Sequence, residues 1–146
     1  RSQNGFCYVN SYGKGKSIYF AGTVGQLLIE MHFPEYMDLT GKMINQNADS
    51  KVRVLNAPAS VSINVRKNED GEILLYLLNY TGPMIRPIQK IVELDHIVLE
   101  TDFDVKNART LYINDNCTVE NKNGKCYITV NKLKEVEVIV FKENNC

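Results

Sequence analysis

The sequence has no tryptophan, only two histidines and only four prolines in 146 residues, and it contains no long apolar run. A membrane-spanning helix needs about 20 consecutive apolar residues, so we predict no membrane partner. Basic and acidic side chains balance at 17 each, which gives a net charge of zero. A nucleic-acid-binding domain usually carries a basic excess, so we predict no nucleic-acid partner either.

Apolar residues are frequent enough for a real core. They make up 44% of the sequence, which favours a folded chain over a disordered one. A length of 146 residues suits one domain, or one domain and a fragment of another.

The four cysteines are widely spaced, at Cys7, Cys117, Cys126 and Cys146. They form no C-x-x-C pair, so no zinc site or other metal centre is predicted. A two-residue turn at Asn123-Gly124 pairs Asn121 with Cys126, which leaves Cys117 too distant for a disulfide in simple register. We therefore favour free thiols and a reducing, cytoplasmic compartment.

The stretch GKGKS, residues 13–17, has the appearance of a phosphate-binding loop. That loop requires an earlier glycine, where this sequence has Asn10, and a helix directly after the serine. The residues that follow Ser17 are Ile, Tyr and Phe, which favour a strand. We therefore predict a β-hairpin over residues 6–20 with a glycine-rich turn, and no nucleotide or other cofactor.

Residues 23–47 are predicted to form helices. Thr23 is a candidate N-cap, and Pro34 suits the first turn of a second helix. The first helix has apolar residues at the spacing of one buried face, namely Val24, Leu27, Leu28 and Met31. The second helix has Tyr36, Leu39 and Met43 on one side.

From Val52 onward the pattern changes to short alternating segments separated by turn signals. This pattern predicts a mainly β fold, an antiparallel immunoglobulin-like β-sandwich of about seven strands, over residues 51–146. The expected strands are SVSINVR, EILLYLLNY, HIVLET, RTLYIN, KCYITV and VEVIVF, with CTVEN as a further one.

Candidate catalytic groups are plentiful but poorly organised. A glycosidase needs two facing carboxyl groups, and strand alternation places Glu93 with Asp95, and Asp102 with Asp104, on common faces. A solvated strand face explains these pairs, and Glu100, more simply. The two histidines are no stronger candidates, because His32 lies on an expected helix among apolar neighbours and His96 points away from Asp95. No catalytic residue is predicted.

Exposed tyrosines could form stacking platforms for sugar rings. The candidates are Tyr76, Tyr80, Tyr112 and Tyr127. Tyrosines in strands are ordinarily half-buried, so we favour a core role for them, and a carbohydrate partner is the alternative.

The most unusual stretch is LLNYTGPMIRPIQKI, residues 77–91. A strand ends in Asn79, Tyr80 and Thr81, and a proline-restricted loop then presents Arg86. We predict that this loop makes a specific contact, with a domain interface favoured over an anionic ligand. Two N-glycosylation sequons, Asn79-Tyr80-Thr81 and Asn116-Cys117-Thr118, are interpreted as chance occurrences in an Asn-rich chain.

Two segments in this order, YGKGKSIYFAGTVGQL and LLNYTGPMIRPIQKIVEL, resemble the C-terminal region of glycoside-hydrolase-like proteins related to the family 42 β-galactosidases. The resemblance covers roughly residues 9–141. In that architecture a catalytic (β/α)8 barrel precedes a flavodoxin-like domain, called the trimerisation domain in β-galactosidases, and a small β-sandwich closes the chain. The barrel and its carboxylates are absent here, as is most of the flavodoxin-like domain.

The resemblance implies that residues 1–50 are the hairpin and closing helices of an incomplete α/β domain. It also implies a non-catalytic accessory or assembly region of a bacterial glycoside hydrolase, with upstream domains of the parent chain as partners and a homo-oligomer as a further candidate. A carbohydrate-binding module is the alternative function. A third hypothesis, that this segment is itself an enzyme, requires a cleft with Glu93, Asp95 or His96.

Overall fold

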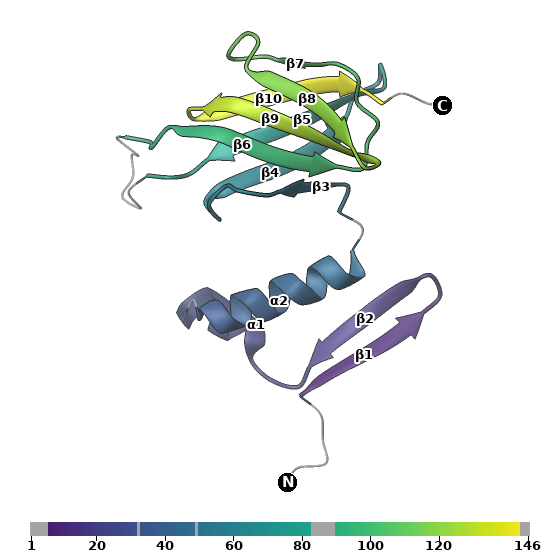
Figure 1. The fold of residues 1–146 in the computed structure, drawn as a ribbon. Helices are drawn as coiled ribbons and strands as arrows, with labels where there is room; N and C mark the ends of the chain where they lie inside the picture. Colours follow the sequence, from purple (N-terminus) through teal and green to yellow (C-terminus); the bar gives the residue numbers. More distant parts are fainter. Residues whose placement is uncertain (1–5, 32, 49, 83–89, 144–146) are drawn as a thin grey trace. The chain divides into compact units, whose positions relative to one another are not determined.

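The structure is a computed structural model that describes residues 6–31, 33–48, 50–82 and 90–143. The chain divides into two compact units, Arg1–Ser50 and Lys51–Cys146, and each is described by itself (Figure 1). The first unit contains a hairpin and helices, and the second contains two antiparallel sheets. The predicted fold class, a mainly β chain with a β-sandwich, is confirmed.

The first unit opens with the predicted hairpin. Strands β1 (Cys7–Tyr12) and β2 (Gly15–Phe20) pair antiparallel, from Cys7 opposite Phe20 to Tyr12 opposite Gly15. Gly13 has φ +57°, the left-handed conformation that glycine adopts at little cost. Within GKGKS, Gly13 and Lys14 form the hairpin turn and the last three residues begin β2, so the segment is no phosphate-binding loop.

The helical segment differs in detail from the prediction. It comprises α1 (Val24–Gln26), the π-helical turn η1 (Leu27–Met31) and α2 (Pro34–Asn47). The widened π turn breaks the predicted 3.6-residue spacing, and Met31 is 58% exposed instead of buried. Thr23 occupies the N-cap position without a side-chain capping bond, whereas Pro34 begins α2 as predicted.

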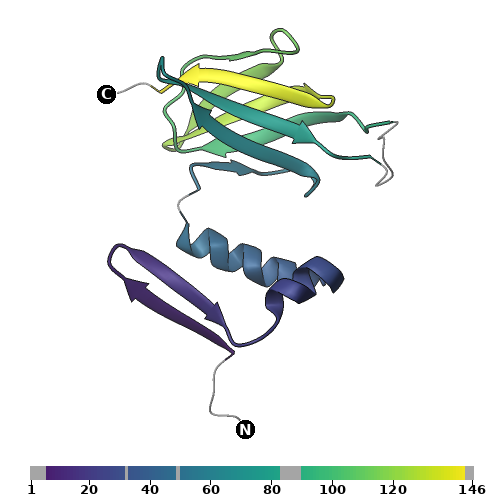
Figure 2. The same ribbon diagram turned by 180° about the vertical axis from the view of Figure 1, so that it is seen from behind.

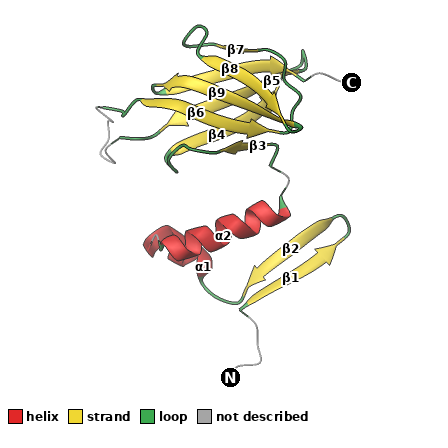
Figure 3. Cartoon of the chain, viewed as in Figure 1, coloured by secondary structure: helices red, strands yellow, loops and turns green. Residues whose placement is uncertain are grey.

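The second unit is a sandwich of two four-stranded antiparallel sheets (Figure 3). The β9 sheet consists of β3 (Val52–Val54), β6 (Leu94–Thr101), β9 (Lys125–Leu133) and β8 (Cys117–Lys122), in that spatial order. The β10 sheet consists of β4 (Val61–Lys67), β5 (Glu72–Asn79), β10 (Val136–Lys142) and β7 (Ala108–Thr110), in that order.

The core lies between the two sheets, because alternate residues of the inner strands point inward. The residues that meet there are almost fully buried: Ile73, Leu75, Leu77, Ile97, Leu99, Ile128, Val130, Ile139 and Phe141. Each such side chain contributes about 1.5–3 kcal/mol relative to an exposed position.

Turn chemistry sets the register of the last strands. Asn123 and Gly124 both have positive φ, 52° and 74°, as a two-residue hairpin turn requires. Asn121 therefore pairs with Cys126, as predicted. Cys7, Cys117 and Cys126 are free thiols, whereas Cys146 lies outside the described residues.

One expected strand is much shorter than predicted. RTLYIN was expected to be a strand throughout, but β7 ends at Thr110, and Leu111 and Tyr112 are 48% and 64% exposed. The physical reason is a side chain on another strand. The carboxylate of Glu137 accepts the backbone N–H groups of Tyr112 and Ile113, so these groups are withdrawn from the sheet.

Candidate functional site

The predicted contact loop begins with a buried asparagine at the end of β5. Asn79 is only 2% exposed, and its Nδ2 donates to the carbonyl oxygens of Val92 (2.8 Å) and Lys134 (2.6 Å). Its Oδ1 accepts the backbone N–H of Thr81 at 2.9 Å. The amide group thus joins three segments that are distant in sequence, and we call these contacts the Asn79 clasp.

Of the other predicted loop residues, Thr81 is hydrogen-bonded within the fold and Tyr80 is exposed at the surface. The Thr81 hydroxyl faces Asn79 Oδ1 and the carbonyl oxygen of Val92, the latter at 2.8 Å, so Thr81 belongs to the clasp. Tyr80 is 56% exposed, and its side chain takes no part in these bonds. Arg86, the residue predicted to make the specific contact, lies outside the described residues. The described part of the loop is therefore a structural anchor with one exposed tyrosine.

Both sequon asparagines are buried and fully hydrogen-bonded. Asn116 is 3% exposed, and its Nδ2 donates to Lys132 O at 2.6 Å and to Glu137 Oε2 at 2.9 Å. Asn79 Nδ2 likewise uses both hydrogens, as described above. A glycan on either nitrogen would remove one of these bonds and place a bulky polar group inside the fold.

We therefore expect expression in a secretory cell to yield folded protein without N-glycan at either sequon, as read by intact mass. Asn64 is exposed on β4 and precedes Val65-Arg66, so Arg66→Thr creates a matched, accessible sequon. That control variant is expected to gain the mass of a glycan. A folded wild-type chain that carries a glycan at Asn79 or Asn116 would contradict the prediction.

Two of the carboxylates considered for catalysis, Glu93 and Asp102, pair with lysines at the surface. Glu93 lies 3.0 Å from Lys132 Nζ, and the hydrogen bond from Lys132 holds the pKa of Glu93 below its ordinary value. Asp102 contacts Lys125, and the hydrogen bond from Lys125 likewise lowers the pKa of Asp102. A general acid needs a raised pKa, so neither carboxylate is tuned for that role.

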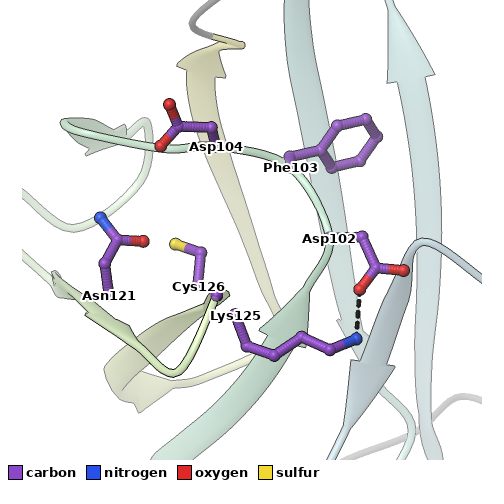
Figure 4. A pocket seen from close by; sticks show the side chains of 7 residues that line it. Asp102, Phe103, Asp104, Asn121, Lys125 and Cys126 are labelled. Atoms are coloured by element: carbon purple, nitrogen blue, oxygen red, sulfur yellow. Dashed lines mark hydrogen bonds and ion pairs between the residues drawn. The ribbon is translucent and has the colours of Figure 1, made fainter.

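A hollow of about 260 Å³ opens at the end of the β8–β9 hairpin (Figure 4). Asp104 and Asn121 flank it, and Lys125 extends away from them toward Asp102. The residues that line it are Asp102, Phe103, Asp104, Asn121, Gly124, Lys125 and Cys126. Its polar side chains are already engaged within the chain, since Lys125 pairs with Asp102 and Asn121 Nδ2 donates to Val105 O at 3.1 Å.

Two of the residues that line the hollow limit its chemistry. The Cys126 thiol lies 3.9 Å from Val105 O, and burial raises its pKa, so the reactive thiolate is disfavoured. Phe103 is 8% exposed and packs on Phe141 with ring centroids 5.8 Å apart. It therefore offers no open face on which a sugar ring could stack.

The four candidate tyrosines fall into two pairs. Tyr76 and Tyr127 are half-buried on central strands, and the Tyr127 hydroxyl donates to Glu100 at 3.4 Å. Tyr80 and Tyr112 are exposed at 56% and 64%. They follow β5 and β7, which lie on opposite sides of β10, so they do not form one continuous platform.

His96 interrupts the regular pairing of β6 with β9, which continues at Asp95 and Ile97 on either side of it. Its φ of 54° is unusual for a residue that is not glycine. Asn56 spans the irregularity: its Nδ2 donates to His96 O at 2.7 Å, and its Oδ1 accepts Val98 N–H at 2.8 Å. His32 lies outside the described residues.

The sequence interpretation missed the most buried polar group, Glu137. Its side chain is 0% exposed and points into the sandwich from β10. Oε1 accepts the N–H groups of Tyr112 and Val138, both at 3.0 Å. Oε2 accepts Ile113 N–H at 3.2 Å and Asn116 Nδ2 at 2.9 Å. The available signal was a single carboxylate on the inward face of an apolar strand.

Within the described ranges, no group of three His, Cys, Asp or Glu side chains could hold a metal ion. No helix in the same ranges is long and apolar enough to cross a membrane.

The structure is an antiparallel β-sandwich preceded by a hairpin and helices, and solved structures of other proteins resemble it. The chain is similar to α-L-fucosidase isoenzyme 2 from Paenibacillus thiaminolyticus, with a TM-score of 0.70 and 17% sequence identity. The similarity covers 88% of this chain but only 21% of the fucosidase chain. No family model matches the sequence, and no curated protein does.

At this identity the similarity shows a shared fold alone. The neighbour is a glycoside hydrolase, which agrees with the resemblance inferred from the sequence at that coarse level. The narrower relation to the family 42 β-galactosidases, and the origin of residues 1–50 in a flavodoxin-like domain, stay predictions.

Proposed function

We propose that this chain is a non-catalytic C-terminal accessory and assembly region of a bacterial glycoside hydrolase. The observation that carries the proposal is the fold shared with the α-L-fucosidase, since 88% of this chain corresponds to 21% of that enzyme. A segment that matches so small a share of an enzyme is typical of an attached domain.

The electrostatics of the second unit support a non-catalytic role. Two of its candidate carboxylates, Glu93 and Asp102, are hydrogen-bonded to lysines, and both have lowered pKa values. Such groups stay ionised at neutral pH and cannot donate the proton that glycoside cleavage requires.

The surface of the first unit supports an assembly role. Of the 17 exposed large hydrophobic residues among the described ones, 11 lie between Phe6 and Ile44. Among the described residues of this unit, Val24 alone is a buried hydrophobic residue. Exposed apolar surface on so small a unit favours burial against further protein, as in a larger α/β domain.

The test compares the longer natural gene product that contains these residues with the 146-residue chain, using p-nitrophenyl α-L-fucoside and β-D-galactoside. We expect the longer protein to hydrolyse an aryl glycoside and the 146-residue chain to hydrolyse neither. Glu93→Gln combined with Asp95→Asn in the longer protein is expected to leave kcat unchanged. Hydrolysis by the 146-residue chain, abolished by that double substitution, would overturn the proposal.

The loop containing Arg86 is a proposed contact with a neighbouring domain, since arginine is enriched in interfaces. Arg86→Ala in the longer protein is expected to weaken assembly or lower thermal stability. Unchanged stability, assembly and activity would argue against this role.

A carbohydrate-binding module is the second candidate, favoured by the exposure of Tyr80 and Tyr112. It predicts hits on a glycan array that Tyr112→Ala removes, because the stacking of a sugar on an aromatic ring is lost with the ring. Tyr12→Ala, at an 84% exposed tyrosine of the hairpin, is the matched control and should leave binding intact. An array without hits would remove this candidate.

A further inference from the structure

The turn between β8 and β9 brings together the two groups that react when an asparagine loses its side-chain amide. These groups are the carboxamide carbon of Asn123 and the backbone nitrogen of Gly124, the next residue in the chain. Lys122 pairs with Lys125, so Asn123 and Gly124 alone form the tip of the hairpin. Both are exposed, and the tip is therefore open to water.

Neither reacting group is restrained by a hydrogen bond. Among the residues that the structure describes, none forms a hydrogen bond with the Gly124 N–H or with the Asn123 side chain. In a two-residue turn the closing bonds belong to the flanking residues, here Lys122 and Lys125. Gly124 has no Cβ, and no atom beyond its chain neighbours lies within 4 Å of the place where a Cβ would be. The nitrogen is therefore accessible to the Asn123 side chain.

Two other exposed asparagines of the sandwich lack these conditions. Asn121 donates its Nδ2 to Val105 O at 3.1 Å and precedes a lysine. Asn64 on β4 precedes Val65, whose β-branched side chain crowds the following nitrogen. Asn4-Gly5 has the same dipeptide as the hairpin tip but lies outside the described residues.

The turn between β4 and β5 provides a closer comparison. Gly71 has φ +77°, close to the +74° of Gly124, and it follows Asp70. The Gly71 N–H, however, donates to Asn68 O at 3.2 Å. The corresponding nitrogen is thus engaged in one turn and free in the other.

From this comparison we infer that Asn123-Gly124 is a site of spontaneous modification, at which the chain deamidates through a cyclic imide. The Gly124 nitrogen loses its proton and bonds to Asn123 Cγ, the Cγ–Nδ2 bond breaks, and ammonia leaves with that proton. Water then opens the imide. Cleavage of the new nitrogen–Cγ bond gives aspartate, and cleavage of the original peptide bond gives isoaspartate. The reaction requires no reagent except water and does not depend on the proposed function.

The two products have different consequences for the fold. Aspartate keeps the backbone path and, like asparagine, adopts positive φ readily. Isoaspartate carries the main chain through its side chain, which lengthens a turn that fixes the strand register. The only strand that pairs with β8 in its sheet is β9. The isoaspartyl form is therefore expected to pair β8 less stably with β9.

Peptide mapping by mass spectrometry tests the site after the 146-residue chain is incubated in mildly alkaline buffer. Cleavage after Lys122 places Asn121 and Asn123 on different peptides. We expect Asn123 to deamidate at least about tenfold faster than Asn121 or Asn64. A protease that cuts before aspartate but not before isoaspartate distinguishes the two products.

Asp70→Asn is the matched variant, because it places the same dipeptide in the turn whose glycine N–H is bonded. The introduced amide is expected to deamidate at least about threefold more slowly than Asn123. Asn123→Asp reproduces the aspartyl product and is expected to keep the wild-type urea midpoint. Chain that has been converted to the isoaspartyl form is expected to unfold at a lower urea concentration.

Equal deamidation at Asn123 and Asn64 would overturn the assignment of this site. Equal rates at Asn123 and in the Asp70→Asn turn would show that the free Gly124 N–H has no part in it. An isoaspartyl chain with the wild-type midpoint would refute the predicted weakening of the β8–β9 pairing.

Discussion

Glu137→Gln is expected to lower the free energy of unfolding by about 2–4 kcal/mol. The carboxylate accepts four N–H groups, two on each oxygen, and it is 0% exposed. An amide keeps one oxygen and turns an NH2 group toward two donors, whichever way it is rotated. The buried donors then lose their acceptor without access to water.

The neighbouring amide cannot adapt to that substitution. Asn116 is fixed by Lys132, because its Nδ2 donates to Lys132 O and its Oδ1 accepts Lys132 N–H at 2.9 Å. A flip that would offer Asn116 Oδ1 to the introduced amide would break both bonds. The two sheets are joined through this pair, since Lys132 belongs to β9 and Glu137 to β10.

Urea denaturation measures the effect, with the midpoint expected to fall and the slope to stay constant. Glu135→Gln is the matched control, because it makes the same chemical change at an exposed position two residues away. The control is expected to lie within about 0.5 kcal/mol of wild type. An equally stable Glu137→Gln chain would mean that the carboxylate is dispensable.

Asn79→Asp is expected to cost about 2–4 kcal/mol at pH 7, because it turns a carboxylate oxygen toward two carbonyl oxygens. Asn79 Nδ2 donates to both Val92 O and Lys134 O in the native clasp. Burial and these acceptors raise the pKa of the new carboxyl above its unfolded value of about 3.9.

The pH dependence distinguishes this cause from a loss of shape. A carboxyl with a raised folded pKa is protonated at low pH, where its O–H can donate to one carbonyl. The deficit of Asn79→Asp relative to wild type is therefore small below about pH 4 and grows as the pH rises through the folded pKa. Asn64→Asp, at an exposed position of β4, should show little deficit at either pH. A deficit in Asn79→Asp that is independent of pH would contradict the electrostatic explanation.

The strands were predictable where alternation and turn residues agree. The segment SVSINVR and the turn at Asn123-Gly124 encode their conformations locally, and the structure has a strand and a two-residue turn there as predicted. The end of β7 was not predictable, because the apolar run after Thr110 is a good strand by local pattern. Its backbone is diverted by Glu137, a residue more than 20 positions further along the chain.

The buried polar groups of the second unit could not be predicted from local sequence pattern either. Asn79 was identified from the sequence as noteworthy, but its predicted role was a surface contact. Its partners at Val92 and Lys134 lie 13 and 55 residues away, so no local pattern reveals that it is buried. The apolar outward surface of β5 and β10, whose strands lie in front in Figure 2, could in contrast have been predicted from the sequence. EILLYLLNY and VEVIVF are apolar at successive positions, which supplies two hydrophobic faces and not one.

The Asn79 clasp has a consequence for how this domain tolerates change. Thr81 O accepts Val92 N–H at 2.8 Å, and Thr81 and Asn79 both donate to Val92 O. The two ends of the intervening segment are thus fastened to each other and to the turn at Lys134. Residues inserted between Thr81 and Val92 would leave the fastening and the sandwich core unaltered, at a chain-entropy cost that grows only slowly with length. We therefore expect that the sequence between Thr81 and Val92 can be lengthened or replaced while the two sheets of the sandwich keep their structure.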